Sequence, residues 1–133
     1  MKRNSSAAVL VLLVLAGCGG SDSSFTDDYN EAVRPLSQLE QGMGTKPGEF
    51  DRLARRTSQT RRNLEKLDPP DDAKDEFDVF LAQLDKVSSD LRSVANAARS
   101  HDVPEQRRAA RELVESSARV QQAETELKQA VEG

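Results

Sequence analysis

Apolar residues recur at alternating spacings of three and four along most of the chain after Ser24. The clearest example follows the letters DPPDD. It consists of Phe77, Phe80, Leu84, Val87, Leu91, Val94 and Ala98, with Leu81 and Ala95 widening the stripe. This period predicts an amphipathic helix of about thirty residues, with a seam like the a and d positions of a coiled coil.

Three other stretches repeat the helical spacing more weakly. The first contains Phe25, Tyr29, Ala32, Leu36, Leu39 and Met43. The second contains Phe50, Leu53, Thr57, Thr60, Leu64 and Leu67, and the last contains Ala109, Leu113, Ser116, Val120, Ala123, Leu127 and Ala130. No stretch alternates with a period of two, so strands are not expected.

Proline and capping residues mark where these helices break. The run Asp68-Pro69-Pro70 must end the helix before it, because proline lacks an amide proton and restricts its neighbour. Asp102 can cap the last helix while Glu105 reaches back to it. Pro35 predicts a kink in a short first helix. The sequence therefore predicts an all-α, antiparallel up-down four-helix bundle over residues 25–133.

Charge narrows the possible partners. The chain carries 19 basic and 23 acidic residues, for a net charge of −4. No nucleic-acid partner is expected, because phosphate contacts need clustered positive charge.

On the last helix, Glu124 and Lys128 have the spacing of an ion pair within a helix.

The N-terminal segment has the layout of an export signal. A short basic start, Met1-Lys2-Arg3, precedes ten uncharged residues, Ala7 to Ala16. A membrane-spanning helix needs about twenty apolar residues, whereas ten is typical of a signal peptide. Leu15, Ala16 and Gly17 then lead into Cys18, and this pattern resembles the lipobox of bacterial lipoproteins.

The resemblance implies a lipidated protein. Residues 1–17 would be the signal peptide, and Cys18 would receive a diacylglyceryl group before cleavage and acylation by a fatty acid such as palmitate. Residues 18–24 would form a Gly/Ser-rich tether, which has little tendency to order. The implied location is the extracytoplasmic face of the cell membrane, with the lipid bilayer as partner. The alternative is that Cys18 is an ordinary small residue near a cleavage site.

The rest of the chain resembles the small helical lipoproteins of actinobacteria. The letters LEKLDPPDDAKDEFDVFLAQL and AARSHD carry this resemblance. It implies an envelope location and a helical bundle, and it implies no activity.

Four hydroxyl side chains interrupt the apolar seams, where a packed bundle favours Leu or Ile. They are Thr57, Thr60, Ser88 and Ser116. Such small polar residues can allow close helix approach, with the hydroxyls bonded to the preceding turn. They can instead line a pocket for a small ligand between the helices. The sequence leaves both interpretations open.

Candidate catalytic chemistry is sparse. His101, the only histidine, lies beside Asp102 and fits a solvated helix end, and the acidic run after Leu67 fits charged helix N-termini. No metal site, cofactor or enzymatic activity is expected. The arginines at 52, 55, 56 and 62 face away from the apolar stripe. They can contact anionic headgroups, or form a solvated face paired with the acidic third helix.

These observations favour a non-enzymatic interaction or structural module tethered to the cell envelope, with an envelope protein as a possible partner. The alternative is a small binding protein that holds an apolar molecule between its helices.

Overall fold

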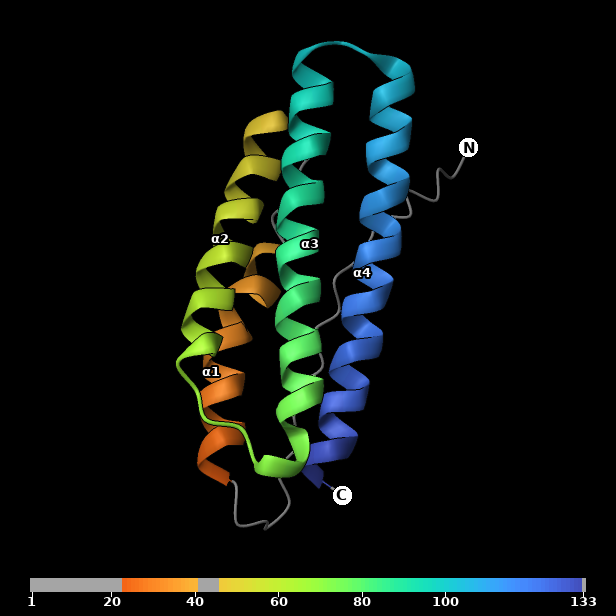
Figure 1. The fold of residues 1–133 in the computed structure, drawn as a ribbon. Coiled ribbons are helices and arrows are strands. Elements are labelled where there is room, and N and C mark those ends of the chain that lie inside the picture. The colour runs from red at the N-terminus through yellow and green to blue at the C-terminus, as the bar shows by residue number, and fades with distance from the viewer. Residues whose placement is uncertain (1–22, 41–45, 133) are drawn as a thin grey trace, which may run out of the picture.

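The computed structural model describes residues 23–40 and 46–132, and the described part of the chain is all helical. Its elements are α1 (Ser23–Glu40), α2 (Pro47–Glu65), the 3-10 turn η1 (Asp71–Ala73), α3 (Lys74–Arg99) and α4 (Val103–Glu132) (Figure 1). None of these helices is long and apolar enough to cross a membrane. The expected helical class and the four helices are therefore confirmed.

The helices start and end close to the predicted positions. Ser23 and Ser24, which the sequence assigned to the tether, already belong to α1. Pro35 lies inside α1, and a kink there stays a prediction. Met43, the last apolar residue of the first predicted stretch, lies outside the described residues.

α3 lies between α2 and α4 and contacts both of them, whereas α1 approaches α2. The α3–α4 turn is at the opposite end of the molecule from the α2–α3 connection, and α1 begins at the end where that connection lies (Figure 1). Apolar side chains from all four helices form one core. Its largest fully buried apolar members are Tyr29, Phe80, Leu64, Leu84, Leu127, Val33, Val87 and Val120.

Aromatic side chains attach α1 to this core. The ring of Phe25 meets that of Phe77 edge-on, with centroids 5.6 Å apart. The ring of Tyr29 lies 5.7 Å from that of Phe80. Edge-to-face and tilted pairs at such distances are favourable, so α1 is held through long side chains directed at α3.

Helix caps agree in part with the sequence. Asp102 accepts a hydrogen bond from the Glu105 amide at 3.1 Å, as expected of an N-cap residue. The Glu105 carboxylate accepts hydrogen bonds from Arg108 instead. Hydrogen bonding to that guanidinium, together with its positive charge, lowers the pKa of Glu105. At the start of α2, the Lys46 amide donates to the Glu49 carboxylate at 3.3 Å.

Candidate functional sites

The lipobox residues Leu15, Ala16, Gly17 and Cys18 lie outside the described residues. The nearest described element is α1, whose first residue follows Cys18 by five positions. A fully extended chain spans at most about 3.5 Å per residue, so five residues reach about 17 Å. An anchor at Cys18 would therefore hold this end of the helical domain close to a bilayer.

The four hydroxyl positions are all buried, as their place on the apolar seams requires. Thr57 donates to the Leu53 carbonyl one turn earlier, at 2.8 Å. Ser116 donates to the Leu113 carbonyl at 3.1 Å. Bonds of this kind satisfy a buried hydroxyl without help from another helix.

Ser88 differs from the other hydroxyls because it links two helices. Its hydroxyl donates to the Ala54 carbonyl of α2 at 3.1 Å and lies 2.6 Å from the hydroxyl of Ser58. Small side chains at this crossing let α2 and α3 approach closely. The geometry of Thr57, Ser88 and Ser116 follows the close-packing interpretation, and a ligand pocket lined by them remains untested.

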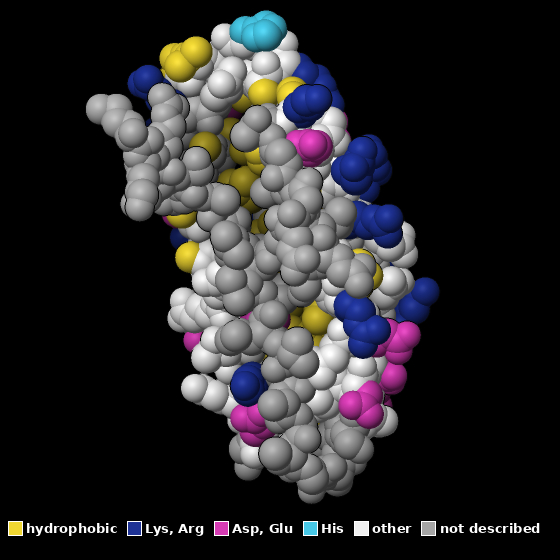
Figure 2. Space-filling view, turned by 180° about the vertical axis from the view of Figure 1, so that it is seen from behind, with side chains coloured by type: hydrophobic (Ala, Val, Ile, Leu, Met, Phe, Trp, Pro, Cys, Tyr) yellow, Lys and Arg dark blue, Asp and Glu magenta, His cyan; other side chains and the backbone are white. Residues whose placement is uncertain are grey.

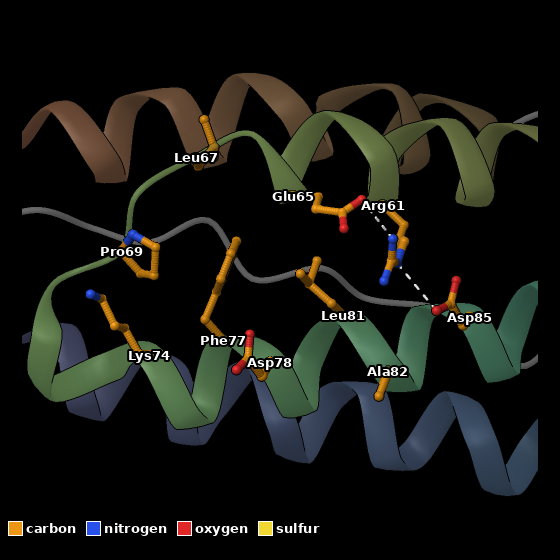
Figure 3. Close-up of a pocket in the computed structure, with 10 residues that line it drawn as sticks. All are labelled: Arg61, Glu65, Leu67, Pro69, Lys74, Phe77, Asp78, Leu81, Ala82 and Asp85. Carbon is orange, nitrogen blue, oxygen red and sulfur yellow. Dashed lines mark hydrogen bonds and ion pairs between the residues drawn. The ribbon is translucent and has the colours of Figure 1, made fainter.

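A pocket of about 450 Å³ lies elsewhere, between α2 and α3 near their connection. Phe77 and Leu81 of α3 point across it toward α2, and Arg61 is linked to Glu65 and Asp85 at one side (Figure 3). The lining also includes Leu67, Pro69, Lys74, Asp78 and Ala82. Its mixture of apolar and charged groups differs from the hydroxyl-lined pocket that the sequence suggested.

Two carboxylate side chains are buried where α3 and α4 pack together: Glu124 on α4 and Asp90 on α3. Glu124, which the spacing placed in an ion pair with Lys128, has no exposed surface and accepts a hydrogen bond from the Tyr29 hydroxyl at 2.7 Å. Burial, followed by the adjacent carboxylate charge and this hydrogen bond, raises the pKa of Tyr29 far above its ordinary value. The pair joins α1 to α4 through the core.

Asp90 of α3 is the second buried carboxylate, with 2 % of its surface exposed. One oxygen accepts from Lys86 at 2.9 Å, while the other, Oδ2, has no hydrogen-bond partner among the described residues. Gln83, seven residues earlier on the same side of α3, likewise has a buried oxygen without a partner in the described part of the chain. Lys86, which bonds to Asp90, lies close enough to Glu112 and Arg119 of α4 for their charges to act on it, so this side of α3 faces α4.

The sequence analysis did not identify Glu124 or Asp90 as core residues. A signal was present for Glu124, because it follows Val120 by four positions and precedes Leu127 by three, which is the spacing of the seam itself. A charged residue at such a position is usually assigned to the surface, since Asp and Glu are rarely buried unless paired. The hydrogen bond from Tyr29, a residue far away in the sequence, helps to make this burial favourable.

The α3–α4 turn places His101 on the surface with a positive φ of 57°. Its amide donates to the Ala98 carbonyl at 3.3 Å, as at the left-handed end of a helix. Among the described residues, no group of three His, Cys, Asp or Glu side chains is placed to hold a metal ion.

The outward side of α2 carries a row of exposed cations, called here the basic face. It consists of Arg52, Arg55, Arg56 and Arg62, together with Lys66 directly after the helix. Figure 2 shows Lys and Arg side chains along the edge of the molecule on which α2 lies. The ion pairs between α2 and α3 use other residues: Arg61 binds Asp85, and Arg99 binds Asp51.

Comparison with known proteins brings no identification: no family model, no curated protein and no solved structure matches this chain.

Proposed function

We propose that this protein is a lipid-anchored helical module of the bacterial cell envelope, tethered through Cys18 to the extracytoplasmic face of the membrane. Its role would be to present helical surfaces to a partner rather than to catalyse a reaction. The observation that carries the proposal is the pattern Leu15-Ala16-Gly17-Cys18, whose first two residues end the apolar run from Ala7 to Ala16.

The helical domain supports this proposal in two ways. It begins five residues after Cys18, so a short tether would hold it beside the bilayer. Its outer surfaces carry many charged side chains, and surfaces of this kind suit docking. We further propose that the four helices form an antiparallel up-down bundle, in agreement with the short connections between α2, α3 and α4.

The alternative is a carrier that holds an apolar molecule between its helices. It has less support, because three of the hydroxyls expected to line a pocket bond to helix carbonyls instead. The pocket between α2 and α3 has a size that suits small ligands. Its rim of carboxylates and cations does not suit an apolar one.

Lipidation is tested first by growing cells with a labelled fatty acid. We expect the unchanged chain to take up the label and to sediment with membranes, whereas Cys18→Ala should do neither, since the thiol that forms the thioether is gone. Ser21→Ala, in the same segment, is the matched control and should behave like the unchanged chain. Equal labelling of Cys18→Ala and the unchanged chain would disprove the anchor.

The interaction role is tested by crosslinking in intact cells, followed by capture and analysis of proteins and small molecules. A protein enriched with the lipidated chain and absent with Cys18→Ala supports a membrane-proximal module. A small molecule retained by both forms, without a protein partner, would replace this proposal with the carrier alternative.

A further inference from the structure

We propose that the basic face of α2 docks onto anionic lipid headgroups of the membrane that holds the tether, so that the helical domain lies along the bilayer. This inference rests on the proposed lipid anchor and names the surface that meets the membrane. The expected binding partner of the basic face is the phosphate-bearing surface of the bilayer rather than an acidic protein.

The basic face is continuous along one side of the helix. Arg52 is followed by Arg55 and Arg56 after three and four residues, and the row continues through Arg62 to Lys66. At a rise of 1.5 Å per residue, the fourteen steps from Arg52 to Lys66 span about 21 Å. The intervening exposed positions of this side, Gln59 and Asn63, are uncharged.

These cations have no carboxylate partner among the residues that the structure describes. Other basic residues do: Arg61 binds Glu65 and Asp85, Arg99 binds Asp51, and Arg108 binds Glu105 and Glu112. Arg62 donates to the amide oxygen of Gln59, which carries no charge. The basic face therefore retains its full positive charge toward solvent.

The rest of the molecule makes this local charge unusual. The chain has a net charge of −4, and the predicted mature form, without Lys2 and Arg3, would carry 17 basic residues against 23 acidic ones. An anionic surface would repel most of such a protein and attract the basic face. Four of its five cations are arginines, whose guanidinium forks match the geometry of phosphate oxygens.

The position of the tether favours a bilayer as the occupant. The C-terminal end of α2, which Lys66 directly follows, is the end of this helix nearer to the start of α1 (Figure 1). An anchor at Cys18 would therefore fix that end near the headgroups, with the rest of the basic face extending along the bilayer. A short flexible tether raises the effective concentration of the basic face at the headgroups to the millimolar range. Weak contacts between single cations and headgroups are then enough to keep the basic face on the membrane.

The experiment attaches the chain from Cys18 onward, which contains every described residue, to vesicles through a maleimide lipid at Cys18. The chain has no tryptophan, so Gln59→Trp places a single fluorophore in the middle of the basic face. Gln122→Trp on α4 is the matched reporter, because both glutamines are exposed and both donate to a side chain four residues later at 3.2 Å. Headgroup-labelled quencher lipids report which fluorophore approaches the bilayer.

We expect the fluorophore at position 59 to be quenched about threefold more than that at position 122 on vesicles with about 30 % phosphatidylglycerol. The difference should vanish on pure phosphatidylcholine and at about 0.5 M salt, where the Debye length is only a few ångströms.

Charge reversal tests the basic face itself. The triple variant Arg52→Glu, Arg55→Glu, Arg56→Glu should lose the difference in quenching. Arg107→Glu, Arg111→Glu, Arg119→Glu is the matched control on α4, since all three arginines are exposed, and it should keep the difference. Helix content by circular dichroism verifies the folding of each variant, and the corresponding Arg→Gln set replaces any variant that loses it.

Equal quenching at positions 59 and 122, or a difference that survives the α2 reversal, would overturn the proposal. Quenching that is equally strong on phosphatidylcholine would also overturn it, because the attraction would then not be electrostatic. The tether is chemical in this experiment, so its result does not depend on whether cells acylate Cys18. A failure of docking and a failure of the proposed anchor are therefore distinguished.

Discussion

Buried polar groups are satisfied differently on the two sides of α3. On the α2 side they are hydroxyls, and Thr57 bonds to a carbonyl of its own helix while Ser88 bonds to one of α2. At α4 the hydroxyl of Ser116 also bonds within its own helix, but this side of α3 carries buried carboxylates as well. Glu124 obtains a hydrogen bond from α1 through Tyr29, and one oxygen of Asp90 has no hydrogen-bond partner among the described residues.

The difference shows how the cost of a buried polar group depends on its chemistry. A hydroxyl can bond to a backbone carbonyl within reach, so it adds little cost wherever the helix places it. A carboxylate loses far more hydration on burial and needs donors supplied by other residues. The stability of the α4 side should therefore depend on a few specific partners, while the α2 side should tolerate loss of its hydroxyls.

The largest effect is expected from Tyr29→Phe, which removes the hydroxyl donor from the buried carboxylate of Glu124. Loss of a hydrogen bond to a charged group should lower the free energy of unfolding by about 2 kcal/mol, measured by urea denaturation. The control is a double-mutant cycle with Glu124→Gln. Strictly additive effects of the two substitutions would show that the pair is not coupled.

High pH should lower the free energy of unfolding through the same tyrosine. The pKa of Tyr29 is raised in the folded protein, so its stabilising contribution is complete below the ordinary value of 10.0 and is lost as the pH rises above it. Between pH 10 and pH 11 the loss should be about 1 kcal/mol, since the unfolded tyrosine ionises while the folded one does not. Urea denaturation of Tyr29→Phe at the same pH values is the control, and an equal decline in both proteins would refute this origin.

Asp90→Leu should have a smaller effect of the opposite sign. Replacing a buried carboxylate that is only half satisfied by an apolar side chain of similar size should raise the free energy of unfolding by about 1 kcal/mol. Asp85→Leu is the control on the same helix and should bring no gain, because Asp85 is exposed and pairs with Arg61. Thermal or urea unfolding that finds Asp90→Leu destabilised would mean that the carboxylate is well satisfied in solution.

Thr57→Val should have the smallest effect. Valine keeps the shape of threonine and removes a hydroxyl that bonds to the preceding turn, so the free energy of unfolding should change by less than about 0.5 kcal/mol. Thr57→Ala, which also removes a buried methyl group, should cost about 1 kcal/mol by the same urea assay. A larger loss with Val than with Ala would mean that the hydroxyl, rather than packing, makes this position important.

The helices and most of their buried faces follow from the sequence, because helical periodicity is local. Phe77, Phe80, Leu84, Val87 and Leu91 lie on the predicted stripe, and all are buried. Asp102 was recognisable as a cap for the same reason, since its partner amide is three residues away. The proposed lipobox at Leu15 to Cys18 is likewise a contiguous pattern, and recognising it needs no tertiary structure.

The partners of charged side chains required the tertiary structure. Sequence spacing suggested Lys128 as a partner of Glu124, whereas the fold brings in Tyr29 from ninety-five residues away. It also pairs Arg61 with Asp85 and leaves the basic face of α2 without carboxylates among the described residues. Periodicity determines which side of a helix turns inward. Only the packing of one helix against another decides which polar groups meet there, because those contacts join residues far apart in the chain.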